Sequence, residues 1–215
     1  MDCCKSPQCQ GIEEVFDDAL AQDELKDYRE RGPSKQTRTL LDAIRAAKLG
    51  EFSLMDVGGG VGAIQHDLAE AGALRITNVD ASPAYSQAAR QEAERCGYAE
   101  RAAYRVGDFV QLSTELEPAD VVTLDRVICC YNDMPALVGA ASRRARKIIG
   151  VVYPRDAWYV KLGMGLINFT QRVMRHPFRV FVHPSAAVDA LIRESGFHPQ
   201  FHQKGFVWQV VVYGK

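Results

Sequence analysis

A turn rich in glycine is the feature of this sequence whose residue types are best suited to chemistry. The segment Leu54–Gly62 reads Leu-Met-Asp-Val-Gly-Gly-Gly-Val-Gly, so an apolar run passes directly into the glycines. Because they lack Cβ atoms, Gly58, Gly60 and Gly62 can turn sharply and let a bulky ligand lie against the backbone. A helix beginning directly after them would add free N–H groups. The segment therefore predicts a ligand-binding turn between a strand and a helix.

The glycines alone leave the ligand of this turn open. Gly58-x-Gly60-x-x-Ala63 also fits the dinucleotide-binding fingerprint in its alanine variant. Asp80 ends the next apolar run, about 20 residues after the turn, where a carboxylate can accept hydrogen bonds from ribose hydroxyls. Asp80 therefore predicts an adenosine-type ligand, and both a nicotinamide dinucleotide and an adenosyl cofactor carry the required ribose.

Further aspartates accompany the apolar runs in a regular order. Asp56 lies before the glycines, Gly107-Asp108-Phe109 closes a third run, and Ala119–Arg126 forms a fourth. A single aspartate of this kind commonly stabilises a turn. The ordered series, however, resembles the class I S-adenosylmethionine-dependent methyltransferases over the stretch from about Phe52 to Pro154. This resemblance favours S-adenosyl-L-methionine as the cofactor.

The resemblance implies roles for the residues that match its motifs. Gly58 and Gly60 would contact the methionine portion of the cofactor, and Asp80 would bind the ribose. Asp108 would bind the adenine amino group, with Phe109 alongside the ring.

Other matching positions extend the predicted cofactor site. Asp56 would face the methionine amino group, and Asp125 and Arg126 would lie at the mouth of the active site, because they end the fourth run. The segment Tyr28–Arg38 resembles a group of bacterial methyltransferases whose leading helices cover the cofactor, which implies that Tyr28, Arg29 and Arg38 belong to a lid. The predicted cofactor-binding residues are Asp56, Gly58, Gly60, Gly62, Asp80, Ala81, Asp108, Phe109, Asp125, Arg126, Tyr28 and Arg38.

Methyl transfer from a sulfonium is an in-line displacement, so alignment of donor and acceptor can supply much of the catalysis. A hydroxyl or thiol acceptor also benefits from a nearby base, whereas a carboxylate or thiolate does not. The predicted catalytic residues are Asp125, Tyr131 and His183. The segment around Tyr131-Asn132 lacks the Asn-Pro-Pro-Tyr-like motif of many amino-group methyltransferases, which argues against an amide or nucleobase nitrogen as the acceptor.

The second half of the chain distantly resembles the magnesium-protoporphyrin methyltransferases, which esterify a tetrapyrrole propionate. The likeness rests on a hydrophobic insertion, on His183-Pro184 before the last helix, and on Ser195-Gly-Phe197 after it. We therefore expect methyl transfer to a small, partly apolar acceptor at an oxygen, a sulfur or a carboxylate. The alternatives are an NAD(P)-dependent oxidoreductase and a non-catalytic regulator that binds an adenosyl ligand.

The elements that must position these residues alternate between short apolar runs and helical stretches. This pattern predicts an α/β fold: a Rossmann-like, mostly parallel seven-stranded sheet with a C-terminal antiparallel hairpin and helices on both faces. The expected strands are Phe52–Val57, Arg75–Asp80, Ala102–Val106, Val121–Leu124, Ile148–Tyr153, Phe197–Gln203 and Phe206–Tyr213. The expected helices are Gly11–Arg31, Ser34–Gly50, Val61–Ala71, Pro83–Cys96, Pro135–Arg146 and Ser185–Ser195.

The 215 residues are expected to form a single domain. Residues 1–10 would be a flexible tail, 11–50 the N-terminal helices, 51–154 the cofactor-binding core, 155–183 a hydrophobic insertion or lid, and 184–215 a helix and the terminal hairpin. Within the insertion, the apolar stretch Ala157–Phe178 fits a lid or a core helix equally well. Lys161, Arg172 and Arg175 at its polar positions leave weak contact with a membrane surface as a further alternative.

Composition limits the partners. The formal charge of −1 and the absence of a basic cluster argue against nucleic acid. The sequence contains no run of about 18 uncharged apolar residues, so no membrane span is predicted and a cytoplasmic protein is expected. The spacing of Cys3, Cys4 and Cys9 matches no zinc pattern, and no metal is predicted.

Overall fold

The computed structural model describes residue 12 and residues 15–215; the tail predicted for residues 1–10, with its three cysteines, lies outside them. The strands are β1 (Phe52–Val57), β2 (Ala73–Asp80), β3 (Ala102–Val106), β4 (Ala119–Asp125), β5 (Ala145–Pro154), β6 (His198–Lys204) and β7 (Trp208–Gly214). Within the described residues they form one seven-stranded sheet in the order β3-β2-β1-β4-β5-β7-β6. The first five strands are parallel, and β7 pairs antiparallel with both β5 and β6. The predicted fold, including the terminal hairpin, is confirmed.

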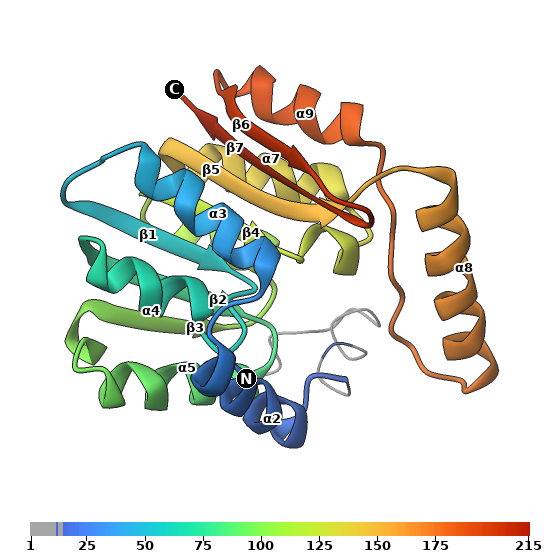
Figure 1. Cartoon of the computed structure of the whole chain (residues 1–215), viewed down its shortest axis with the longest axis horizontal. Helices are drawn as coiled ribbons and strands as arrows, with labels where there is room; N and C mark the ends of the chain where they lie inside the picture. Colours follow the sequence, from blue (N-terminus) through green and yellow to red (C-terminus); the bar gives the residue numbers. More distant parts are fainter. Residues whose placement is uncertain (1–11, 13–14) are drawn as a thin grey trace.

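Helices cover both faces of this sheet (Figure 1). The α-helices with described bounds, some of which lie elsewhere, are α2 (Asp18–Arg31), α3 (Lys35–Ala46), α4 (Ala63–Glu70), α5 (Pro83–Arg95), α6 (Phe109–Leu112), α7 (Met134–Arg144), α8 (Trp158–Val173) and α9 (Ser185–Glu194). Apolar side chains of α3, α4 and α5 share one core cluster with Leu54 of β1, whereas those of α7 and α9 share another with Met55 and Val57. Successive β1 side chains thus enter opposite cores, which explains why the strand is a continuous apolar run and not an alternating one.

The N-terminal region differs from the single helix predicted for Gly11–Arg31. Helix α2 begins only at Asp18, because Phe16 and Asp17 leave the helical conformation. The Asp17 side chain accepts a hydrogen bond of 2.9 Å from the backbone N–H of Leu20 and caps the helix. The prediction of one helix was therefore wrong: the apolar period continues through a cap that starts a new helix.

The other boundaries agree with the predictions to within a few residues. Ser34 caps α3 as expected, since its hydroxyl accepts a hydrogen bond from the N–H of Thr37. Helix α4 starts at Ala63 and not at the predicted Val61, because Gly62 has φ +87° and completes the preceding turn. These differences leave the sheet order and the glycine turn unchanged.

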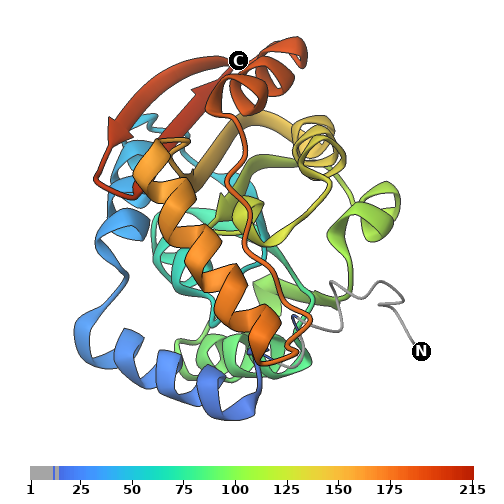
Figure 2. The same cartoon turned by 90° about the vertical axis from the view of Figure 1, so that its right-hand side faces the viewer.

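Helix α8 corresponds to the predicted hydrophobic insertion. It stands beside the sheet and not against either face (Figures 1 and 2). Val160 is its buried residue, while seven large apolar side chains between positions 158 and 174 are exposed: Trp158, Leu162, Leu166, Ile167, Phe169, Val173 and Met174. The core-helix alternative is therefore wrong, because a core helix would bury these side chains.

Candidate active site

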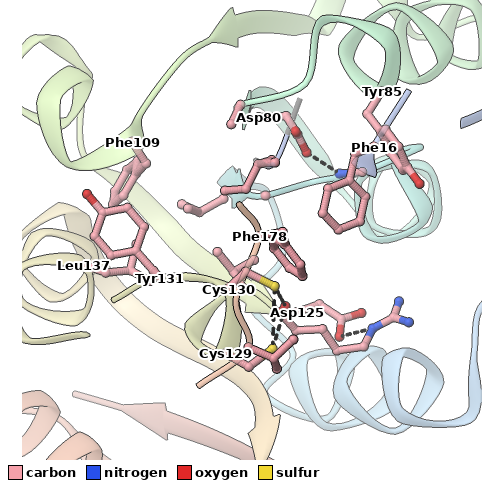
Figure 3. Close-up of a pocket in the computed structure, with 18 of the residues that line it drawn as sticks. Phe16, Asp80, Tyr85, Phe109, Asp125, Cys129, Cys130, Tyr131, Leu137 and Phe178 are labelled. Carbon is pink, nitrogen blue, oxygen red and sulfur yellow. Dashed lines mark hydrogen bonds and ion pairs between the residues drawn. The ribbon is translucent and has the colours of Figure 1, made fainter. Parts of the chain in front are cut away.

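The carboxyl ends of β1, β2 and β4 meet at one cavity of about 420 Å³ (Figure 3). Glu24 of α2 and Met164 and Ile167 of α8 also line it. This is the edge at which open α/β sheets place their ligands. The volume is in the range of small-molecule sites. The cavity is therefore the candidate active site.

The glycine turn that follows β1 forms one wall of this cavity through Gly58 and Gly60. Both have positive φ angles, of 61° and 55°. At Gly58 an added Cβ would lie 2.4 Å from Cγ2 of Val127, so a side chain is excluded sterically as well as conformationally. The backbone must therefore form the ligand-facing surface here.

The other two glycines of the turn have different roles. Gly62 does not line the cavity; it is the N-cap of α4. Gly59 was not singled out from the sequence, yet an added Cβ there would lie 2.2 Å from Nδ2 of Asn78. The turn thus lies so tightly over β2 that only glycine fits at position 59.

Asp80, at the end of β2, faces the cavity together with Ala81. Its Oδ2 accepts a hydrogen bond of 2.9 Å from the N–H of Gly60, and its Oδ1 accepts one of 2.8 Å from the N–H of Ser82. Burial raises the pKa of this carboxyl, while both backbone donors oppose the shift. Asp80 therefore joins the glycine turn to β2 and keeps carboxylate lone pairs available to ribose hydroxyls.

Asp108, Phe109 and Tyr131 form a second wall. Asp108 caps α6 by accepting a hydrogen bond of 2.9 Å from the N–H of Val110. The Tyr131 hydroxyl donates toward both carboxylate oxygens of Asp108, at 3.0 and 2.9 Å. The structure thus brings Tyr131, a predicted catalytic residue, to the predicted adenine-binding carboxylate.

Asp125 ends β4, Arg126 follows it, and both line the cavity. The hydroxyl of Thr37 on α3 donates to Oδ2 of Asp125 at 2.6 Å, and Nε of Arg126 donates to Oδ1 at 3.2 Å. Arg126 has φ 61°, a left-handed conformation that is uncommon outside glycine and characteristic of functional turns. Thr37 was not predicted, because it lies 88 positions from Asp125 in the chain and no local pattern connects the two residues.

Asp56 does not line the cavity, contrary to the position predicted for it. It is 2% exposed, and its Oδ1 accepts a hydrogen bond of 2.7 Å from the hydroxyl of Thr123. Its Oδ2 lies beneath Gly59 and has no hydrogen-bond partner among the described residues. Burial raises the pKa of Asp56 to about 7, although the Thr123 hydrogen bond opposes the shift. Asp56 supports the turn from below.

Three further predicted residues lie outside the cavity wall. Tyr28 packs against the ring of His66 in a separate, smaller cavity. Arg38 donates to the backbone carbonyls of Arg31 and Pro33 and so fixes the connection between α2 and α3. His183 donates from Nε2 to the carbonyl of Tyr131 at 3.0 Å. Each of these side chains is occupied by a contact that joins elements of the fold.

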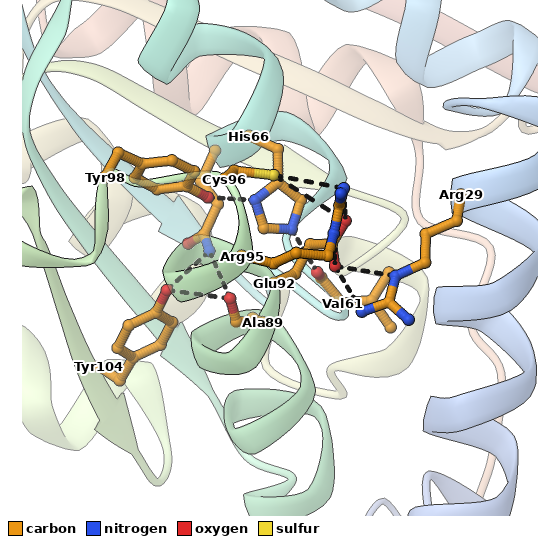
Figure 4. A network of polar contacts seen from close by, with 10 residues as sticks. Arg29, Val61, His66, Ala89, Glu92, Arg95, Cys96, Tyr98 and Tyr104 are labelled. Carbon is orange, nitrogen blue, oxygen red and sulfur yellow. Dashed lines mark hydrogen bonds and ion pairs between the residues drawn. The ribbon is translucent and has the colours of Figure 1, made fainter.

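Arg29, the third predicted lid residue, belongs to a polar network between α2 and α5 (Figure 4). Its Nη2 lies 2.6 Å from Oε2 of Glu92, whose side chain is fully buried, and Arg95 binds the same carboxylate. Hydrogen bonds from Arg95 and Arg29 lower the pKa of Glu92 to about 2 despite its desolvation. This ion pair holds α2, which carries Glu24 into the cavity wall.

Several cavity residues were not found from the sequence. They are Ile12, Phe16, Glu24, Val57, Val79, Tyr85, Val127, Cys129, Cys130, Leu137 and Trp208. Gly107, Met164, Ile167, Phe178 and Val180 also line the cavity, and they belong to segments that the sequence had singled out. Phe16 packs edge to face with both Tyr85 and Phe178, at 5.6 and 5.8 Å between ring centroids. Glu24 and burial together raise the pKa of the Tyr85 hydroxyl. These residues come from segments far apart in the chain, so local motifs could not group them.

The described cavity wall carries a net negative formal charge. Its described lining includes four carboxylates, Glu24, Asp80, Asp108 and Asp125, and one guanidinium, that of Arg126. Such a wall favours a cationic ligand over the pyrophosphate of a dinucleotide, because like charges repel.

The Rossmann-like fold of this chain is shared with solved methyltransferases. Magnesium protoporphyrin IX methyltransferase from Synechocystis PCC 6803, solved with bound SAH, aligns at a TM-score of 0.72 and 18% identity over 97% of this chain and 99% of that chain. An O-methyltransferase family protein from Burkholderia thailandensis aligns at 0.70 and 13% identity over 95% of this chain and 62% of that one. At these identities the likeness concerns the fold.

A comparison with protein families gives a match over part of the chain. Residues 55–148 match the family model described as a methyltransferase domain. No curated protein matches the sequence. Residues 55–148 are therefore similar to a methyltransferase domain, and the chain as a whole shares the fold of the solved methyltransferases.

Proposed function

We propose that the protein transfers the methyl group of S-adenosyl-L-methionine to a small, partly apolar acceptor. The observation that carries the proposal is the acidic cavity built on the glycine turn, since it suits a ligand that contains a sulfonium and a ribose. Gly58 and Gly60 hold the methionine portion, Asp80 with Ala81 the ribose, and Asp108 with Phe109 the adenine. The cofactor supplies the electrophilic methyl group, and the protein holds donor and acceptor in line.

The remaining cavity wall supports an apolar acceptor. Phe16, Met164, Ile167, Phe178 and Trp208 line the cavity beside the proposed cofactor residues. Contacts with such side chains favour the binding of aromatic or aliphatic acceptors, because apolar surface is buried. The acceptor atom proposed is an oxygen, a sulfur or a carboxylate.

Asp125 is the proposed base for an acceptor that must lose a proton. It lies at the cavity mouth with one oxygen held by Thr37 and the other by Arg126, so its position is fixed. Tyr131 is a positioning residue in this scheme, because its hydroxyl is engaged with Asp108. His183 helps to position Tyr131 by donating a hydrogen bond to its backbone carbonyl.

A reducing compartment such as the cytoplasm is proposed for the reaction. Cys96 and Cys129 are free thiols, and Cys129 lies in the cavity wall. Thiols of this kind persist where glutathione and thioredoxin keep cysteines reduced.

Two measurements test the proposal. Isothermal titration should show binding of S-adenosylmethionine and its demethylated product; binding of NADH alone would promote the oxidoreductase alternative. A turnover assay should then detect release of S-adenosylhomocysteine with at least one member of a panel of phenols, thiols, carboxylates and porphyrins. Cofactor binding without release for any acceptor would favour a non-catalytic regulator.

A further inference from the structure

Helix α8 has two apolar faces, of which only one has a partner in the described structure. Met164 and Ile167 point toward the cavity and line it. On the opposite side lie Trp158, Leu162, Leu166, Phe169 and Val173, which we call the outer face of α8; their exposed fractions are 75, 68, 64, 63 and 67%. Positions spaced by three and four residues form one stripe on a helix. Large side chains gathered in this way mark an interaction surface.

The fold holds this face outward. The side chain of Asn168 accepts a hydrogen bond of 2.8 Å from the N–H of Val180 and donates one of 2.7 Å to its carbonyl. At the other end, Tyr159 stacks on Phe206 in the turn between β6 and β7, and its hydroxyl donates to the Phe206 carbonyl at 2.8 Å. Helix α8 therefore cannot rotate to bury its outer face without breaking these contacts. Figure 2 shows α8 in front of the molecule, with no other helix or strand over it.

The apolar surface also extends beyond the helix. Phe206 is 77% exposed and lies next to the first turn of α8, and Met174, just past the last turn, is 78% exposed. Among the described residues no helix is both long enough and apolar enough to cross a bilayer. A 16-residue helix is about 24 Å long, which suits contact along a surface.

The charged residues near the outer face of α8 indicate which kind of partner can bind there. Residues 157–188 contain Lys161, Arg172, Arg175 and Arg179 and no aspartate or glutamate. Asp156, just before α8, accepts hydrogen bonds from the N–H and hydroxyl of Ser185. In a symmetric dimer through α8 the cations of both copies would approach each other without carboxylates of this segment to pair with. An anionic surface complements them.

We propose that the outer face of α8 docks the protein on an anionic lipid bilayer. Trp158, Leu162, Leu166 and Phe169 enter the boundary between headgroups and acyl chains, and the basic residues of the segment bind lipid phosphates. The basic residues that take part are Lys161, Arg172 and Arg175, because Arg179 is half-buried and donates to the backbone carbonyls of His176 and Phe178. This is the physical arrangement of an interfacial amphipathic helix, in which buried apolar area and electrostatic attraction both contribute. The inference does not depend on methyl transfer.

Sedimentation with vesicles tests the docking surface. The full chain should bind vesicles of phosphatidylcholine mixed with phosphatidylglycerol, bind pure phosphatidylcholine weakly, and release as salt increases. The double variant Leu166→Gln/Phe169→Gln should reduce binding about tenfold or more, because both side chains lose their favourable transfer into the bilayer. Lys161→Gln/Arg172→Gln should remove the preference for anionic vesicles while leaving residual binding.

Matched readouts keep the outcome clear. Brominated lipid should quench the emission of Trp158, and Trp158→Phe should abolish that quenching. Circular dichroism and titration with S-adenosylmethionine serve as controls for folding, since the substituted side chains do not line the cavity. Equal vesicle binding by wild type and Leu166→Gln/Phe169→Gln, or no binding to anionic vesicles at low salt, would overturn the proposal. Dimerisation of the wild type that this double variant abolishes would assign the face to a second copy.

Discussion

Asp80 offers the sharpest test of the cofactor site. Its carboxylate accepts the N–H of Gly60 at 2.9 Å and the N–H of Ser82 at 2.8 Å while facing the cavity. Asp80→Asn preserves the size of the side chain but removes the charge and turns an amide N–H₂ toward one of the donors. Hydrogen bonds to a charged group contribute roughly 1.5–3 kcal/mol. If the ribose uses this carboxylate, the Kd for S-adenosylmethionine should rise about 10- to 150-fold.

Isothermal titration of wild type and variant measures this change, and Asp120→Asn provides a matched control. Asp120 also accepts a backbone N–H, that of Ser53 at 3.0 Å, but it lies at the amino end of β4, away from the cavity. Asp120→Asn should lower Tm without affecting the Kd. An Asp80→Asn variant with unchanged Kd and lowered Tm would refute the reasoning and reduce Asp80 to a support for the turn. Equal losses of affinity in both variants would show that the change in Kd reflects a general loss of stability and not a lost contact with the ribose.

Three other outcomes follow from the site geometry. Burial raises the pKa of Asp56 from 3.8 to about 7 in the folded protein. The stability that the protonated carboxyl contributes is therefore complete below pH 3.8 and is lost as the pH rises through about 7. Asp56→Asn should therefore flatten a decline of Tm between about pH 4 and about pH 7, and an unchanged pH profile would contradict this assignment. Glu92→Gln should lower the free energy of unfolding in urea by roughly 1.5–3 kcal/mol, because Arg29 loses a charged acceptor; an unchanged midpoint would mean that the ion pair adds no net stability. Met164→Ala/Ile167→Ala should raise KM for the acceptor and leave the cofactor Kd within about twofold, whereas parallel losses would place both side chains at the cofactor.

The fold was predictable because its signals are local. The continuous apolar run of β1, the glycines after it and the alternation of strands with helices follow from burial on both faces of a parallel sheet. The break at Phe16 and Asp17 was missed because an N-cap and an apolar period can overlap in the same residues. The exposure of α8 could not be predicted, since an amphipathic pattern does not say whether a neighbouring element covers the apolar face.

The site was only partly predictable. Gly58, Gly60, Asp80, Asp108 and Asp125 carry motif signals, and the structure brings all of them to one cavity. Tyr28, Arg38, Asp56 and His183 carried signals as well, but their side chains are turned toward other contacts. Direction of a side chain is set by packing, which sequence spacing does not specify.

By itself, the sequence determined the strand that enters the glycine turn and the carboxylates that end the neighbouring strands, because backbone freedom and burial act within a few residues. The tertiary structure alone decided what surrounds them. It buried Asp56 beneath Gly59, joined Thr37 to Asp125, and brought Glu24 into an acidic wall. It also left the outer face of α8 uncovered. Contacts of this kind join distant segments, so they depend on the folding of the whole chain around its sheet and not on any local pattern.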